Sequence, residues 1–113
     1  MTNLHSHAFQ RAMAGMTERR GETDDSFWTW RKLMYRFLDR LTPEHVEAIA
    51  AFVQMEMLEA GYSANVEFHY LHHQPGGSPY ANIAEMAERI TNPDFVPGEH
   101  GFLGLIDALS GFD

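Results

Sequence analysis

The chain has 113 residues, of which 44% are hydrophobic and 21% charged, a composition typical of one small globular domain and not of a disordered segment. The formal net charge of −8 argues against nucleic-acid binding, which normally needs a basic surface. The sequence contains no cysteine, which excludes disulfides, thiolate catalysis and a cysteine-ligated zinc site.

The first elements in chain order are short. The segment TNLHSH, residues 2–7, is interpreted as an initial strand, although it is too short for its pattern alone to decide. AFQRAMAGM, residues 8–16, has helical spacing, and a polar loop, TERRGETDD, follows it. Apolar residues then recur every three or four positions from Phe27 to Leu41, which predicts an amphipathic helix capped by Asp24, Asp25 or Ser26.

The clearest helix follows, over residues 42–60. Thr42 is a good N-cap, Pro43 suits the first helical position, and Gly61 can end the helix as its C′ residue. The alternating segment ANVEFHYL, residues 64–71, predicts a strand with Val66, Phe68 and Tyr70 on one face. A loop, a short helix over residues 81–90, a second loop and a weak helix over residues 101–112 complete the chain.

This order of strand, helices, strand and helix predicts an α/β fold with parallel pairing and helical crossovers. Both predicted strands end in histidines, in the motifs HSH and HYLHH. Because ligand sites in such folds lie beyond the carboxyl ends of the strands, these motifs stand where chemistry is expected. No apolar run reaches the ~18 residues of a membrane span and no secretory signal pattern is present, so we expect a cytoplasmic protein without a membrane partner.

Histidine is the most informative residue type in the chain. On a strand, His5 and His7 point to the same face and can aim two imidazoles at one point, which suits Zn²⁺, Fe²⁺ or Ni²⁺. Two polar residues at a strand end remain the alternative interpretation. The other histidines are interpreted as loop polarity, helix surface or structural groups; they are His45, His69, His72, His73 and His100.

Three segments carry a resemblance to a known family: NLHSHAFQRAMAGMTERRG, DSFWTWRKLMYRFLDRLTPE and EFHYLHHQPGGSPYA. They resemble the formimidoylglutamate deiminases of the amidohydrolase superfamily, and the resemblance runs over residues 2–90. It implies a partial (β/α)8 TIM barrel, because a complete barrel needs roughly 250 residues. We therefore expect residues 1–90 to form the first βα units of an amidohydrolase barrel, followed by a divergent C-terminal tail of unknown role over residues 91–113.

The resemblance also implies roles for five residues. His5 and His7 would be two ligands of a single catalytic zinc ion, and Gln10, Arg31 and Tyr70 would hold the substrate. In the family the arginine reaches the active site of a neighbouring subunit, which implies a homodimer. These residue types suit a substrate with two carboxylates, because arginine binds a carboxylate through two hydrogen bonds and Gln and Tyr supply neutral ones.

The implied reaction is metal-assisted hydrolysis of N-formimino-L-glutamate to N-formyl-L-glutamate and ammonia, a step of histidine degradation. It also requires a third histidine ligand, an aspartate, and Glu and His proton carriers from later strands, and the spacing of His100 and Asp107 does not support them as substitutes. We therefore expect this chain to be inactive alone. Two alternatives stay open: another deaminase of the same superfamily, and a truncated, non-catalytic protein that forms oligomers.

Overall fold

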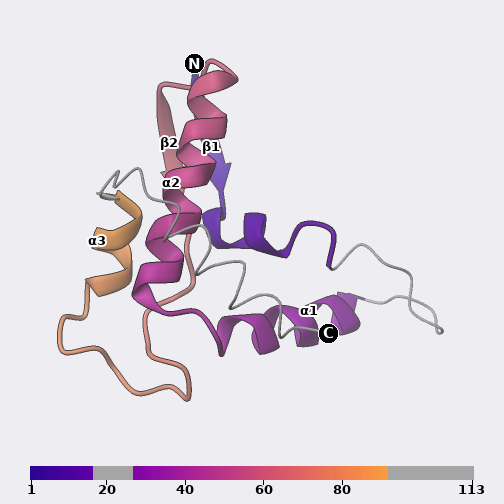
Figure 1. Cartoon of the computed structure of the whole chain (residues 1–113), viewed down its shortest axis with the longest axis vertical. Helices are drawn as coiled ribbons and strands as arrows, with labels where there is room; N and C mark the ends of the chain where they lie inside the picture. Colours follow the sequence, from indigo (N-terminus) through magenta and orange to yellow (C-terminus); the bar gives the residue numbers. More distant parts are fainter. Residues whose placement is uncertain (17–26, 92–113) are drawn as a thin grey trace.

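The computed structural model describes residues 1–16 and 27–91, and the elements alternate along the chain much as predicted (Figure 1). They are the strand β1 (Thr2–Ser6), the 3₁₀ helix η1 (Ala8–Met13), the helices α1 (Phe27–Leu38) and α2 (Pro43–Glu59), the strand β2 (Ala64–Glu67) and the helix α3 (Glu85–Thr91). The predicted caps Asp24, Asp25 and Ser26, the predicted helix over residues 101–112 and all of the tail except Thr91 lie outside the described residues.

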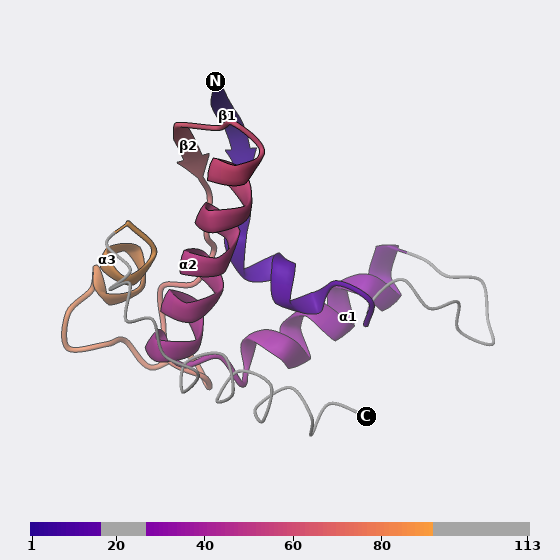
Figure 2. The same cartoon turned by 45° about the horizontal axis from the view of Figure 1, so that its top comes forward.

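The two strands form one parallel pair, as the βα order predicts. Thr2 lies opposite Ala64 and Ser6 opposite Glu67, with an irregularity in the register between Asn3 and Ser6. Both arrows run the same way, and the connection between them passes through the helices (Figure 2). The carboxyl ends of β1 and β2 therefore lie side by side, so the residues that follow them meet at one edge.

Local sequence signals set both ends of α2. The Thr42 hydroxyl accepts a hydrogen bond from the His45 N–H at 3.3 Å, and His45 Nδ1 accepts one from the Thr42 N–H at 3.3 Å. At the other end Gly61 adopts a φ of 89°, and the Tyr62 N–H bonds the Met57 carbonyl at 2.9 Å. This is the Schellman arrangement that a C′ glycine permits. The predicted cap and stop are confirmed, but His45 is half-buried in a capping box instead of on the open surface.

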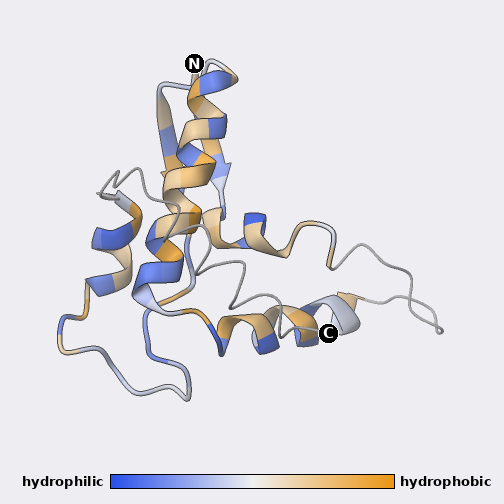
Figure 3. Cartoon of the chain, in the orientation of Figure 1, coloured by the Kyte–Doolittle hydropathy of each residue, from blue (hydrophilic) through white to orange (hydrophobic). Residues whose placement is uncertain are grey.

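The core lies mainly between the helices (Figure 3). Helix α2 packs against η1 and α3, and the strands contribute only Ser6 to the buried residues. The buried apolar residues are Ala8, Phe9, Met13, Met34, Phe37, Leu41, Val46, Ile49, Ala50, Val53, Leu71, Met86 and Ile90. Strand side chains such as Leu4, which is 76% exposed, therefore lie uncovered by the described residues.

Three sequence predictions need correction. The second strand ends at Glu67 instead of residue 71, so Phe68 and Tyr70, predicted to share a strand face with Val66, lie beyond it, and Phe68 is 62% exposed. The strand stops there because its partner β1 ends at Ser6, opposite Glu67. The chain then reaches a φ of 56° at Tyr70, which extended backbone does not accommodate. Phe27, predicted on the apolar face of α1, is 65% exposed. Helix α3, predicted to begin at residue 81, begins at Glu85. Asn82 holds the preceding turn, because its Oδ1 accepts a hydrogen bond from the Ala84 N–H at 3.0 Å.

Across residues 1–16 and 27–91, no helix is both long enough and apolar enough to cross a membrane.

Candidate functional site

The structure brings His5 and His7 together at the carboxyl end of β1. Their Nε2 atoms lie 2.8 Å apart, and their rings meet edge to face with centroids separated by 4.6 Å. Ser6, between them in sequence, is buried, while His5 is exposed and His7 half-buried. The two imidazoles thus converge on one point at the surface, on the side of the strand away from Ser6.

The contact made by Nδ1, the other ring nitrogen of His7, decides which nitrogen of this ring carries the proton. His7 Nδ1 lies 2.6 Å from the carbonyl oxygen of Phe68, just beyond the end of β2. A carbonyl oxygen can only accept a hydrogen bond, so Nδ1 carries the proton and Nε2 of neutral His7 presents a lone pair. In metalloproteins a ligating histidine usually donates its other N–H to a carbonyl or carboxylate in this way.

Tyr70 lies against this histidine pair. Its ring stacks on the His7 ring, with centroids 5.1 Å apart and planes inclined by 26°, and meets the Phe9 ring edge to face. The Leu71 N–H bonds the His69 carbonyl at 2.6 Å across Tyr70, which forms a γ-turn with a φ of 56° at the tyrosine. Such a turn is rare and costs about 1–3 kcal/mol for a residue other than glycine, so the surroundings must hold it in place.

The two remaining predicted substrate residues lie on different elements. Gln10 is half-buried on η1, one turn after His7, and its N–H bonds the His7 carbonyl at 3.0 Å. Arg31 lies on α1, where Nε and Nη2 donate to the Tyr35 hydroxyl at 3.2 and 2.9 Å. Its guanidinium also lies over the Trp28 and Tyr35 rings. The described contacts of Arg31 are thus within its own helix, whereas His5, His7, Gln10 and Tyr70 cluster around the end of β1.

Glu67 is a site-forming residue that the sequence interpretation missed. Its Oε1 accepts a hydrogen bond from the Ala8 N–H at 2.7 Å, and its Oε2 lies 3.5 Å from the Asn65 side-chain amide. The only sequence signal was a charged residue within the predicted strand over residues 64–71, two residues before the histidine motif. The parallel register, which places Glu67 opposite Ser6, is what carries its carboxylate to the segment of His7.

The second histidine cluster has a different character. The rings of His69 and His72 lie 4.7 Å apart, and the buried His69 Nε2 has no hydrogen-bond partner among residues 1–16 and 27–91. Burial lowers the pKa of His69, the nearby His72 lowers it further, and Glu67 opposes both effects. Neither cluster reaches three ligands: among residues 1–16 and 27–91, no group of three or more His, Asp or Glu side chains is placed to hold a metal ion.

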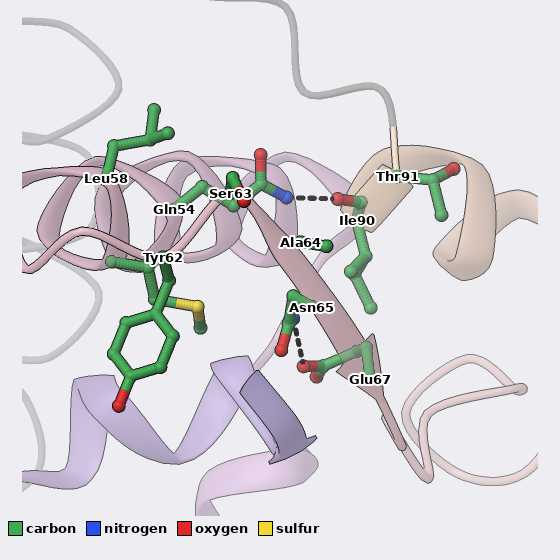
Figure 4. A pocket seen from close by; sticks show the side chains of 10 residues that line it. Gln54, Leu58, Tyr62, Ser63, Ala64, Asn65, Glu67, Ile90 and Thr91 are labelled. Atoms are coloured by element: carbon green, nitrogen blue, oxygen red, sulfur yellow. Dashed lines mark hydrogen bonds between the residues drawn. The ribbon is translucent and has the colours of Figure 1, made fainter. Parts of the chain in front are cut away.

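A cavity of about 320 Å³ lies away from the histidine pair, between α2, β2 and the end of α3 (Figure 4). Its walls include Gln54, Asn65, Glu67 and Ile90, and the Gln54 amide closes one side by donating to the Ile90 carbonyl at 2.8 Å. Neither His5 nor His7 lines it. The cavity therefore marks the side of β2 that the described residues leave unpaired, and not the predicted substrate site.

Comparison with known proteins gives one close relative in sequence. The chain is 59% identical over 91 residues to the formimidoylglutamate deiminase of Pseudomonas aeruginosa, a match that covers 80% of this chain. This chain is similar to formimidoylglutamate deiminase. The resemblance predicted from the histidine, tryptophan and HYLHH motifs is confirmed. The chain spans about 20% of that relative's length, and no protein-family model matches it.

Comparison with solved structures identifies the fold. An amidohydrolase from Brucella melitensis superimposes on all of this chain with a TM-score of 0.77 and 41% sequence identity, and the chain spans 33% of that protein. The predicted fold class is therefore confirmed: the chain has the α/β fold of part of an amidohydrolase TIM barrel. The parallel β1–β2 pair with its helical crossover corresponds to the repeating unit of such a barrel.

Proposed function

We propose that this chain forms the first βα units of a metal-dependent hydrolase that deiminates N-formimino-L-glutamate to N-formyl-L-glutamate and ammonia. One observation carries the proposal: the His5–His7 pair, with the proton of His7 on Nδ1 and the Tyr70 ring against it, stands at the carboxyl end of a barrel strand. Active sites of TIM-barrel enzymes lie at this end of the strands. The 59% identity to a formimidoylglutamate deiminase supports the choice of substrate.

The donor set fits zinc as part of a site. Neutral imidazole nitrogens bind zinc at about 2.0–2.1 Å, and two nitrogens on a tetrahedral ion lie roughly 3.3–3.4 Å apart. At the observed 2.8 Å, His7 Nε2 accepts a hydrogen bond from His5 Nε2. Binding zinc would therefore require a small outward movement of the rings and a shift of the His5 proton to its Nδ1. A catalytic zinc usually has three protein ligands, so we propose that the others come from later strands of the barrel. When bound, the ion would act as a Lewis acid toward the formimino group.

The remaining site residues would bind the substrate. Tyr70 stacks on His7, and Gln10 follows His7 by one turn of η1, held by its backbone N–H on the His7 carbonyl. We propose that their hydroxyl and amide make neutral hydrogen bonds to the substrate. Arg31 would hold a substrate carboxylate, and we propose that it does so in a neighbouring subunit, because its described contacts lie within α1 and none reaches the histidine pair. The aromatic surface around it also supports self-association: Phe27 is 65%, Trp28 64% and Tyr35 47% exposed.

Self-association is expected to depend on this aromatic surface. Sedimentation velocity should show a dimer or larger species for the unaltered chain, and the F27S/W28S variant should sediment mainly as a monomer at the same concentration, because it loses two exposed aromatic rings. I83S is the matched control, since Ile83 is 84% exposed but lies outside α1. A compact monomer of the unaltered chain would contradict the proposal.

A second candidate is a non-catalytic, self-associating protein. It is favoured by the lack of a third metal ligand near the pair in the described part of the chain. If this second candidate is correct, His5 and His7 are only polar residues at the end of β1 and bind no catalytic metal.

A graft separates the two functions. The matched segment of the Pseudomonas aeruginosa formimidoylglutamate deiminase is replaced by the corresponding residues of this chain, so that the rest of the barrel is supplied by the relative. The graft is expected to retain metal and to hydrolyse N-formimino-L-glutamate, because this chain carries the proposed site residues and is 59% identical to the relative over the matched segment. Ammonia release measures the reaction, and a correctly folded graft without turnover favours the non-catalytic candidate.

A further inference from the structure

We propose that Glu67 is a positioning residue for His7: its carboxylate fixes the backbone that follows the histidine, so that Nε2 faces His5. The inference rests on the proposed metal-binding role of His7. Glu67 itself touches neither imidazole in the described hydrogen bonds; it acts through the Ala8 N–H, which it holds at 2.7 Å. In this bond a side chain supplies the acceptor for a backbone N–H just beyond the end of β1.

Three hydrogen bonds join the end of β2 to the segment of His7. The Phe68 N–H bonds the Ser6 carbonyl at 2.9 Å, the Ala8 N–H bonds Glu67 at 2.7 Å, and His7 Nδ1 donates to the Phe68 carbonyl at 2.6 Å. The first two fix the backbone on either side of His7, and the third fixes its ring. Glu67 and Phe68 thus hold three consecutive residues, Ser6, His7 and Ala8.

The Ala8 amide needs this partner. Ala8 is the first residue of η1, where the helix itself offers no acceptor for the N–H group. It is also 6% exposed, so water cannot readily replace a lost acceptor, and an unpaired buried amide is costly. A carboxylate is the stronger acceptor for such an N–H, because charge-assisted hydrogen bonds are shorter and stronger than neutral ones.

The irregular register explains why a side chain is required. The pairing between β1 and β2 shifts between Asn3 and Ser6, and β1 ends at Ser6 as the chain turns into η1. The Ala8 N–H therefore leaves the ladder, and no main-chain carbonyl of β2 is bonded to it. Asn65, two residues earlier on the same strand, lies 3.5 Å from the second carboxylate oxygen and helps to orient it.

The test compares variants that keep or remove the acceptor. E67Q loses the charge but keeps an oxygen that can accept from Ala8; E67M has a similar length and no acceptor; E67D keeps the charge but is too short to reach. In E67M and E67D we expect hydrogen exchange of the Ala8 amide to accelerate about tenfold or more. In the same variants, ¹⁵N spectra should show His7 losing its preference for the Nδ1–H tautomer. Affinity for added Zn²⁺ should fall about 10- to 100-fold. In all three measurements E67Q should lie between the unaltered chain and E67M, because its amide oxygen still accepts the bond but is a weaker acceptor than a carboxylate.

The outcomes separate this inference from the proposed function. An unaltered chain that binds no Zn²⁺ refutes the metal site, while the Ala8 exchange rate and the His7 tautomer still decide the role of Glu67. Unchanged exchange and an unchanged tautomer in E67M and E67D overturn the inference. Equal loss in E67Q and E67M also overturns it, because charge and not the hydrogen bond would then be responsible. Should E67M fail to fold by circular dichroism, E67D and E67Q supply the comparison.

Discussion

Replacing both His5 and His7 by alanine in the graft is expected to remove the bound metal and to lower kcat/KM by about a thousandfold or more. A Lewis-acid metal supplies several kcal/mol of stabilisation to the transition state, and each 1.4 kcal/mol corresponds to a factor of ten in rate. The double substitution removes both proposed ligand atoms, the Nε2 atoms of His5 and His7, which lie 2.8 Å apart. Metal analysis of the purified protein and ammonia release measure the two effects.

The histidines of the second cluster provide the matched control. The H72A/H73A variant also removes two imidazoles, but both residues are exposed on the loop after β2. We expect it to keep its metal and most of its activity. A graft that retains one metal ion per site after loss of His5 and His7 would show that the ligands lie elsewhere in the protein.

The second large effect concerns recognition of the substrate. R31A in the graft is expected to lower kcat/KM by about tenfold to more than a hundredfold, because a charge-assisted hydrogen bond to a carboxylate contributes roughly 1.5–3 kcal/mol. Y70F removes only a hydroxyl, whose neutral hydrogen bond contributes about 0.5–1.5 kcal/mol, so its effect should be smaller. The phenyl ring that remains in Y70F can still stack on His7 as the tyrosine ring does. Neither variant should change the metal content, since neither residue is proposed as a ligand.

K32A is the control for Arg31, because it removes a neighbouring exposed cation from the same helix. It should leave kcat/KM within a factor of about two. If R31A behaves like K32A while the metal is retained, Arg31 serves only its described contacts with Trp28 and Tyr35. The substrate carboxylates would then be held by other groups.

Sequence alone predicted the elements whose signals are local. Thr42, Pro43 and Gly61 fix both ends of α2 through groups within a few residues of them, and each predicted role is confirmed. The strand order followed from the same kind of reasoning, since a helical connection between short strands favours parallel pairing. The fold class was therefore accessible before the structure.

Features that depend on contacts between distant parts of the chain could not be predicted from the sequence. The end of β2 is set by the end of its partner β1 at Ser6, and a positive φ at Tyr70 follows; an alternating sequence pattern indicates neither. Glu67 became part of the site only because the register of β2 against β1 carries it to Ala8, 59 residues earlier in the chain. The exposure of Phe27 likewise follows from where α1 packs, which its own periodicity does not encode.

The candidate site was predicted in two different ways. The pairing of His5 and His7 followed from strand geometry, while the roles of Gln10, Arg31 and Tyr70 came from the resemblance to the family and remain proposals. The structure places the Tyr70 ring against His7, bonds the Gln10 backbone N–H to the His7 carbonyl and shows Arg31 in contact with its own helix. Arg31 is thus the residue whose proposed role depends most on a second subunit.

Turnover of N-formimino-L-glutamate by the unaltered graft, measured together with its metal content, tests the central claim most directly. The account predicts one metal ion per site and a kcat/KM within about tenfold of the Pseudomonas aeruginosa enzyme, because this chain supplies both the histidine pair and the substrate-binding residues. It also predicts that H5A/H7A in the same graft abolishes both. A folded graft that turns over equally well with and without His5 and His7 would contradict the account.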